Sequence, residues 1–152
     1  MKKSIATLCA LVLVALAGES WAGPAEEVAQ IAGSRGKMFE EGTAEALTAA
    51  FADNAVLMSS LSGFRIEGKE AIRAYFTELF QLYPGRRLFT RQPSTRAYND
   101  DLVIQNVYNA LYLTDQKGQV TQLALRASLV WAKVGGHWQI VEQHVSRLPV
   151  IH

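Results

Sequence analysis

The second half of the chain alternates apolar and polar residues, which is the pattern of β-strands with one buried face. The alternation starts at Arg86 and is interrupted by three short groups of turn-forming residues. Pro93 indicates a bend or an edge position in the first strand, because proline cannot donate a hydrogen bond to a neighbouring strand. The pattern predicts an antiparallel meander of four strands, with turns at Asn99-Asp100, Asp115–Gly118 and Gly135-Gly136: Arg86–Tyr98, Asp101–Thr114, Gln119–Lys133 and His137–Arg147.

The first half of the chain spaces its apolar residues mainly for helices. Pro24, followed by two glutamates, favours a helix start in the segment Pro24–Glu41. Thr43 can cap a second helix, whose apolar stripe runs to Phe51. After a turn at Asp53-Asn54, the pattern predicts two short strands and then the strongest helix of the chain: Ala55–Ser60, Gly63–Gly68 and Lys69–Gly85.

This order of elements predicts an α+β fold. Helices that precede a meander can cover only one face of its sheet, so we expect three N-terminal helices packed on one side of a curved antiparallel sheet. The other face is then available to a second subunit. We expect a homodimer, or a higher homo-oligomer, through strand-borne apolar residues on the outer face of the sheet: Val103, Val107, Leu111, Leu125, Leu129 and Trp131.

Residues 1–22 have the composition of a signal peptide. Lys2 and Lys3 precede an apolar run that is short for a membrane span, and Ser20-Trp21-Ala22 offers small residues at a cleavage site. We therefore expect a periplasmic or secreted product with one domain, residues 23–152, and no membrane association after cleavage. The only cysteine, Cys9, lies in the leader, so the mature domain is stabilised by its core rather than by disulfides.

Charge and motifs exclude several classes of partner. Removing the leader takes the 15 basic residues to 13 and the 14 acidic residues to 13, so a polyanionic partner such as nucleic acid is not expected. The three histidines are scattered at 137, 144 and 152, and the mature chain has no cysteine, so neither a metal site nor a cofactor is predicted.

Three segments resemble a known superfamily: GTAEALTAAFADNAVLMSS, FRIEGKEAIRAYF and RASLVWAKVGGHWQIVEQHVSRLP. They are similar to the nuclear transport factor 2-like, SnoaL-like superfamily, in the branch similar to the association domain of calcium/calmodulin-dependent protein kinase II, with its SgcJ/EcaC-type bacterial proteins. The likeness covers nearly all of Pro24–Pro149. In the final hairpin Gln143 and Val145 depart from the usual histidine and serine, whereas ten residues match: Arg126, Ser128, Gly136, Trp138, Ile140, Val141, Glu142, His144, Ser146 and Pro149.

The resemblance implies a cone-shaped, cystatin-like α+β barrel with an internal pocket, usually dimeric. The superfamily hosts isomerases, dehydratases and cyclases as well as non-catalytic association domains, so the fold alone does not select a function.

The last strand carries the candidate site. Alternation places Trp138, Ile140, Glu142, His144 and Ser146 on one face. A two-residue loop at Gly135-Gly136 would pair Arg126 with Val145. A three-residue loop, Val134–Gly136, would pair Arg126 with His144 and bring Ser128, Glu142 and Ser146 to the same face. We favour the second register, because it forms one polar cluster beside an apolar wall.

In that register Arg126 could anchor an anion or a carbonyl group, and His144 could donate a hydrogen bond or act as a general base. Tyr75 and Tyr108 could add hydroxyl groups to the same pocket. A purely structural polar network is the competing interpretation.

The sequence thus predicts an exported protein that binds a small organic molecule near Arg126 and His144, with His144 pointing into the pocket. Two alternatives remain open. One is a small isomerase or dehydratase that uses His144 in acid–base catalysis. The other is a non-catalytic association module, whose pocket would be filled by its own side chains.

Overall fold

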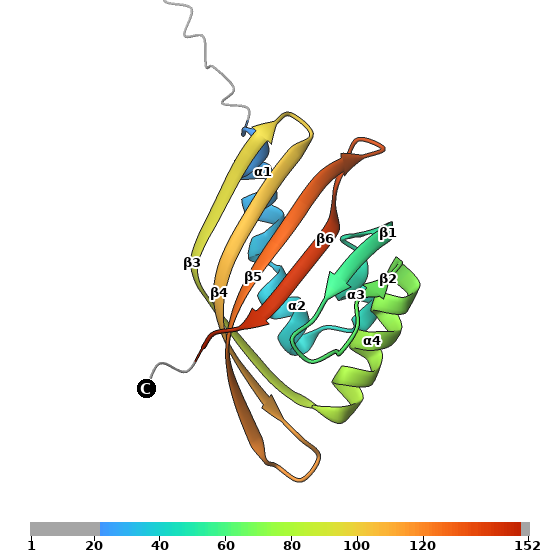
Figure 1. The fold of residues 1–152 in the computed structure, drawn as a ribbon, viewed down its shortest axis with the longest axis vertical. Coiled ribbons are helices and arrows are strands. Elements are labelled where there is room, and N and C mark those ends of the chain that lie inside the picture. The colour runs from blue at the N-terminus through green and yellow to red at the C-terminus, as the bar shows by residue number, and fades with distance from the viewer. Residues whose placement is uncertain (1–21, 150–152) are drawn as a thin grey trace, which may run out of the picture.

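The computed structural model describes residues 22–149, so the predicted cleavage site lies almost entirely outside the described part of the chain. Four helices and six strands follow one another as shown in Figure 1: α1 (Pro24–Gly33), α2 (Arg35–Glu41), α3 (Ala44–Thr48), β1 (Phe51–Met58), β2 (Ile66–Glu67), α4 (Lys69–Leu82), β3 (Gly85–Asn99), β4 (Leu102–Thr114), β5 (Val120–Val134) and β6 (His137–Arg147). The predicted α+β architecture is confirmed.

The six strands form one sheet in the order β2-β1-β6-β5-β4-β3. The four long strands form the predicted meander, and β3 at the edge shows an irregularity between Arg91 and Ser94, beside Pro93. β1 runs parallel to β6 and antiparallel to β2. The sheet is therefore mixed, and the prediction of a purely antiparallel sheet is wrong, because β1 is joined to the meander through the long helix α4 rather than through a hairpin.

The helices cover one face of the curved sheet, and the opposite face is turned toward the viewer in Figure 1. On β4 and β5 the odd-numbered residues face the helices and most of them are buried, whereas the even-numbered residues face outward. The six residues that were expected to form an outer interface belong to the buried set: Val103, Val107, Leu111, Leu125, Leu129 and Trp131. That expectation is wrong, because the helices and the curvature of the sheet cover all six.

Three local predictions in the N-terminal half are also corrected. The segment Pro24–Glu41 is not one helix but two, separated at Ser34, next to the helix-weakening Gly33. Phe51 belongs to β1 rather than to a helical stripe, and Asp53-Asn54 lie within the same strand instead of forming a turn. Phe51 is fully buried, so its packing in the core decides its conformation.

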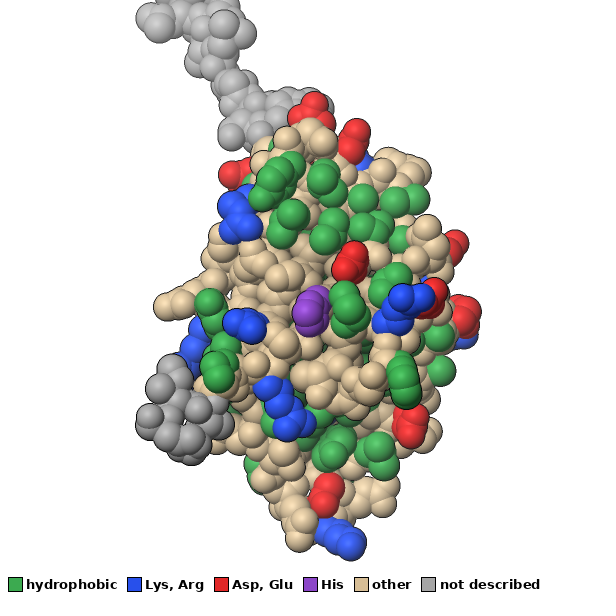
Figure 2. All heavy atoms as spheres, in the orientation of Figure 1, with side chains coloured by type: hydrophobic (Ala, Val, Ile, Leu, Met, Phe, Trp, Pro, Cys, Tyr) green, Lys and Arg blue, Asp and Glu red, His purple; other side chains and the backbone are tan. Residues whose placement is uncertain are grey.

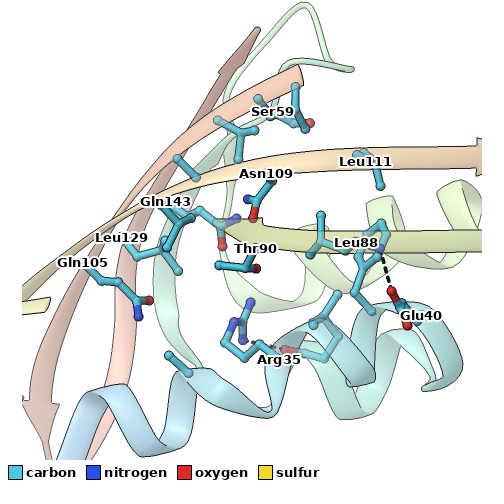
Figure 3. A pocket seen from close by; sticks show the side chains of 18 of the residues that line it. Arg35, Glu40, Ser59, Leu88, Thr90, Gln105, Asn109, Leu111, Leu129 and Gln143 are labelled. Atoms are coloured by element: carbon cyan, nitrogen blue, oxygen red, sulfur yellow. Dashed lines mark hydrogen bonds between the residues drawn. The ribbon is translucent and has the colours of Figure 1, made fainter. Parts of the chain in front are cut away.

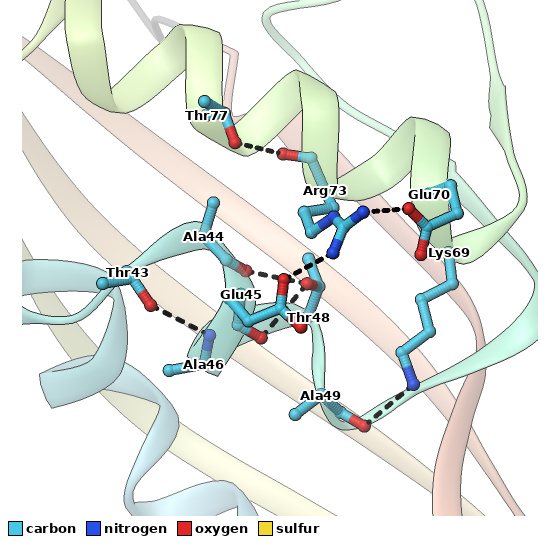
Figure 4. Close-up of polar contacts among 10 residues, drawn as sticks. All are labelled: Thr43, Ala44, Glu45, Ala46, Thr48, Ala49, Lys69, Glu70, Arg73 and Thr77. Atoms are coloured by element: carbon cyan, nitrogen blue, oxygen red, sulfur yellow. Dashed lines mark hydrogen bonds and ion pairs between the residues drawn. The ribbon is translucent and has the colours of Figure 1, made fainter.

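Helices α3 and α4 are joined by polar contacts (Figure 4). The predicted cap is present, because the Thr43 hydroxyl accepts a hydrogen bond from the Ala46 amide at 3.1 Å. Arg73 on α4 bridges Glu45 on α3, at 2.6 Å, and Glu70 on its own helix. These pairs are exposed, so they orient the helices more than they stabilise them.

The register between β5 and β6 is different from both predicted alternatives. Gly135 and Gly136, with φ of 58° and 83°, form the two-residue loop, which pairs Val134 with His137. A bulge between Val130 and Trp131 then shifts the pairing by one residue. Beyond this bulge Arg126 pairs with Ser146, and Ser128 pairs with His144. Among the described helices, none is long and apolar enough to cross a membrane.

Candidate functional site

A cavity of about 820 Å³ lies between the concave face of the sheet and the helices α1, α2 and α4 (Figure 3). Its size falls within the usual range for sites that hold small molecules. Most of the wall is apolar, and it includes Phe39, Phe76, Leu79, Leu111, Leu125 and Leu129. Strands β3 to β6 supply one side of the cavity because their inward-facing residues alternate with outward-facing ones.

Arg35, the first residue of α2, extends from its helix into this cavity (Figure 3). One guanidinium nitrogen, Nη1, donates a hydrogen bond to the Leu47 carbonyl at 3.1 Å. The guanidinium carbon also lies 5.2 Å from the centre of the Phe51 ring. Burial lowers the pKa of Arg35 to about 10, so the side chain still carries its positive charge at neutral pH.

A hydroxyl pair lies at another part of the wall. The oxygens of Ser59 and Tyr75 are 2.6 Å apart, and both residues line the cavity. Burial raises the pKa of the Tyr75 hydroxyl, and the hydrogen bond with Ser59 only partly opposes this shift. Tyr75 therefore stays neutral at physiological pH and can offer a ligand a hydroxyl group.

Two amide side chains, Asn109 on β4 and Gln143 on β6, line the same cavity and point into it (Figure 3). Their oxygens Oδ1 and Oε1 are buried and have no hydrogen-bond partner within the described chain. Gln105, by contrast, donates a hydrogen bond to Thr95 at 3.4 Å. Buried polar atoms are nearly always paired in folded proteins, so these two amides indicate a place for a polar ligand group.

Helix α2 lies at the rim of the cavity and is fixed there by hydrogen bonds. Glu40 accepts a hydrogen bond from the Leu88 amide at 2.7 Å, which ties α2 to β3. Arg86 donates to the carbonyls of Phe39 and Glu40, at 2.9 and 3.3 Å, and so satisfies the end of the same helix. These contacts fix the C-terminal part of α2 over the sheet, and Arg35 is the first residue of the same seven-residue helix.

Comparison with protein families gives a match to the SnoaL-like domain over residues 28–151. The chain belongs to the SnoaL-like domain family. A search of curated proteins returned no match.

The fold of this SnoaL-like domain recurs in solved structures of low sequence identity. A protein provisionally described as a calcium/calmodulin-dependent protein kinase II association domain, from Xanthomonas campestris, aligns with a TM-score of 0.75 and 23% identity, over 86% of this chain and 91% of its own. A nuclear transport factor 2-like protein of unknown function from Pseudomonas putida KT2440 gives 0.71 and 20%, over 80% and 84%. A protein provisionally described as a scytalone dehydratase, from Novosphingobium aromaticivorans, gives 0.72 and 11%, over 80% and 82%.

The SnoaL-like domain brings the predicted polar residues of β5 and β6 together, but on the outer face of the sheet, which Figure 2 shows. Arg126 donates a hydrogen bond to Ser146 at 3.0 Å, and Ser128 lies opposite His144. None of this group lines the cavity: Arg126, Ser128, Glu142, His144 and Ser146. The prediction that His144 points into the pocket is therefore wrong. Whether this outer group binds a ligand stays a prediction.

The two tyrosines that were predicted for the site lie on different sides of the sheet. Tyr75 lines the cavity, whereas Tyr108 lies opposite Arg126 on the outer face and is 46% exposed. The residues of β6 that line the cavity are Gln143 and Val145, the two residues that depart from the superfamily pattern.

Sequence reasoning missed Arg35, Asn109 and Gln143. For Arg35 a signal was present: it lies seven residues after Val28 and four before Phe39, on the buried stripe of the predicted helix. A charged residue on the apolar stripe of a helix is a candidate for a binding role. Within residues 22–149 no group of three or more His, Cys, Asp or Glu side chains could hold a metal ion.

Proposed function

We propose that this SnoaL-like domain binds a small, largely apolar organic molecule in the cavity between its helices and the concave face of its sheet. The observation that carries the proposal is the cavity itself, about 820 Å³ of space lined in part by buried apolar residues of the core. Protein interiors contain few voids larger than a water molecule unless these serve a purpose. The apolar wall with a few inward polar groups suits an organic ligand.

Two observations support binding over the alternatives. A module that only associates with other subunits has no need of such a cavity and would fill it with its own side chains. An enzyme that uses His144 would need that ring beside its substrate, yet His144 is exposed on the other face of the sheet. Among the described residues, the ionisable side chains at the cavity are Arg35, Lys37, Glu40, Glu41 and Tyr75. His144 therefore gives no reason to transfer the dehydratase description of the Novosphingobium protein to this chain.

The proposal is tested by filling the cavity. Ala127 lies in the centre of the wall on β5, so Ala127→Phe places a ring in the space a ligand would occupy. Ala124 lies on the same strand but faces outward, so Ala124→Phe is the matched control. Binding of the neutral fluorescent probe N-phenyl-1-naphthylamine is measured by titration. We expect the Ala127 variant to bind the probe at least about tenfold more weakly and the Ala124 variant to bind it normally.

Circular dichroism and thermal melts must show that both variants are folded. Equal binding by all three proteins, or no binding of the probe by the unmodified protein, would count against a ligand cavity.

A further inference from the structure

Arg35 is half-buried, and its positive charge has no carboxylate partner among the described residues. No ion pair joins it to a carboxylate in the described part of the chain, and desolvation is the cause of its lowered pKa. Its guanidinium group has five N–H donors, of which one hydrogen bond, to the Leu47 carbonyl, is made within that part. Burying a charge without a partner is strongly unfavourable, so such a residue needs a reason that folding does not provide.

The remaining donors of Arg35 face the cavity. Arg35 lines it, and in Figure 3 its guanidinium group extends from α2 toward the strands rather than toward solvent. Arginine binds carboxylates through two parallel hydrogen bonds, which makes it the usual anchor for such groups in proteins. A carboxylate on the ligand would supply the missing negative charge.

We propose that the ligand of this cavity is an organic acid whose carboxylate binds Arg35 while its apolar body lies against the strands. This inference rests on the proposed function and restricts its ligand to an organic acid. Leu111, Leu125 and Leu129 offer the body an apolar wall on β4 and β5. Two acidic side chains line the cavity: Glu40 accepts a hydrogen bond from the Leu88 amide, and Glu41 lies 3.9 Å from Lys37.

The two amides without partners add a second requirement. Asn109 Oδ1 and Gln143 Oε1 are closed off from solvent, so a donor on the ligand would satisfy them once the amide groups turn these oxygens toward the cavity. An amide also carries an N–H₂ group that can serve a ligand acceptor. The site therefore suits an acid with a hydroxyl or amino group on its apolar body better than a plain hydrocarbon acid.

The test compares two probes of nearly equal shape, 2-naphthoate and the neutral 2-naphthamide, by isothermal titration. We expect the unmodified protein to bind 2-naphthoate at least about tenfold more tightly. Arg35→Met should remove this preference by weakening 2-naphthoate and leaving 2-naphthamide unchanged. Arg73→Met removes a positive charge that lies outside the cavity, on α4, and should leave both affinities unchanged.

A stability measurement separates this role from a structural one. If Arg35 serves the ligand, Arg35→Met should melt at the same temperature as the unmodified protein or higher, because it removes a buried charge without a partner. Arg35→Gln is the second variant, in case methionine disturbs the packing against Phe51. It too should lose the preference for the acid.

The outcomes distinguish the two proposals. Tight binding of both probes without a preference for the acid would overturn the inference and leave a cavity for neutral ligands. Binding of 2-naphthoate that persists in both Arg35 variants would also overturn it. Failure of every probe, N-phenyl-1-naphthylamine included, would overturn the proposed function itself.

Discussion

Gln143 illustrates how one residue can weaken a fold in favour of a site. Its amide oxygen is buried on the concave face of the sheet without a partner in the described chain. Leaving such an atom unpaired costs about 1–3 kcal/mol, whereas an apolar side chain of similar size has no such cost. Residues of this kind are typical of binding sites, where stability is lowered locally for the sake of a ligand.

We therefore predict that Gln143→Leu raises the free energy of unfolding by about 1 kcal/mol, because it removes a buried acceptor and keeps the side-chain volume. Urea denaturation monitored by tryptophan fluorescence measures the change. Gln105→Leu is the contrasting variant, since Gln105 is also buried on the concave face but donates a hydrogen bond to Thr95. An equal gain from both substitutions would show that the missing partner of Gln143 is not the cause.

The elements of the fold were more predictable than the positions of single side chains. Alternation in the second half of the chain predicted the four long strands and the turn at Gly135-Gly136, because both patterns are local. The bulge in β6 was not predictable, because it depends on how the strand must bend over the core. The shift of one residue puts Trp138 and Ile140 on the face that the helices cover and leaves Glu142, His144 and Ser146 on the outer face, so the single face predicted for these five residues was wrong.

The predicted site was missed for a related reason. Alternation correctly grouped Arg126, Glu142 and His144 on one face but could not say which face the helices cover. The packing of α1 and α2 decides this, and it depends on contacts far apart in the sequence. Tyr75 was found because it lies on the apolar stripe of α4, which must face the core.

Helix α1 is attached to β5 and β6 by two polar contacts of Glu27. The indole nitrogen of Trp138 donates a hydrogen bond to Glu27 at 2.6 Å, and Lys133 lies 3.7 Å from the same carboxylate. We predict that Glu27→Ala lowers the free energy of unfolding by about 1–3 kcal/mol, because it leaves the buried Trp138 N–H without its partner. Chemical denaturation measures the loss.

The control is Glu26→Ala. Glu26 lies in the same first turn of α1, so both substitutions lose the same interaction with the helix dipole. Glu26 is exposed, and its replacement should change stability by no more than about 0.5 kcal/mol. A similar loss in both variants would mean that the turn, and not the contact with Trp138, carries the effect.

At the scale of the whole molecule, export remains a prediction. It rests on residues 1–22, nearly all of which lie outside the described part of the chain. We expect the exported protein to begin at Gly23, and mass spectrometry of its N-terminus measures this directly. An intact Met1 in the exported fraction would contradict cleavage. The described fold begins at Pro24 with α1, so cleavage after Ala22 would leave every described helix and strand intact.

A homodimer through the outer face of the sheet is likewise still a prediction, and it now depends on different side chains. Phe89 and Tyr108 on this face are 51% and 46% exposed. Figure 2 shows further hydrophobic side chains on the same face, gathered mainly toward one end of the sheet. Aromatic residues exposed on a sheet are typical of interfaces between subunits.

We predict that the protein elutes as a dimer in light scattering at micromolar concentration and that Tyr108→Glu converts it to a monomer. The substitution replaces an aromatic ring by a charge that must lose its water on association, and this loss is costly even though Arg91 and Arg126 lie opposite the position on the neighbouring strands. Phe64→Glu is the control, because Phe64 is 86% exposed but lies in the loop before β2, away from the centre of the sheet. A monomeric unmodified protein would contradict the dimer. A dimer that survives Tyr108→Glu would place its interface elsewhere.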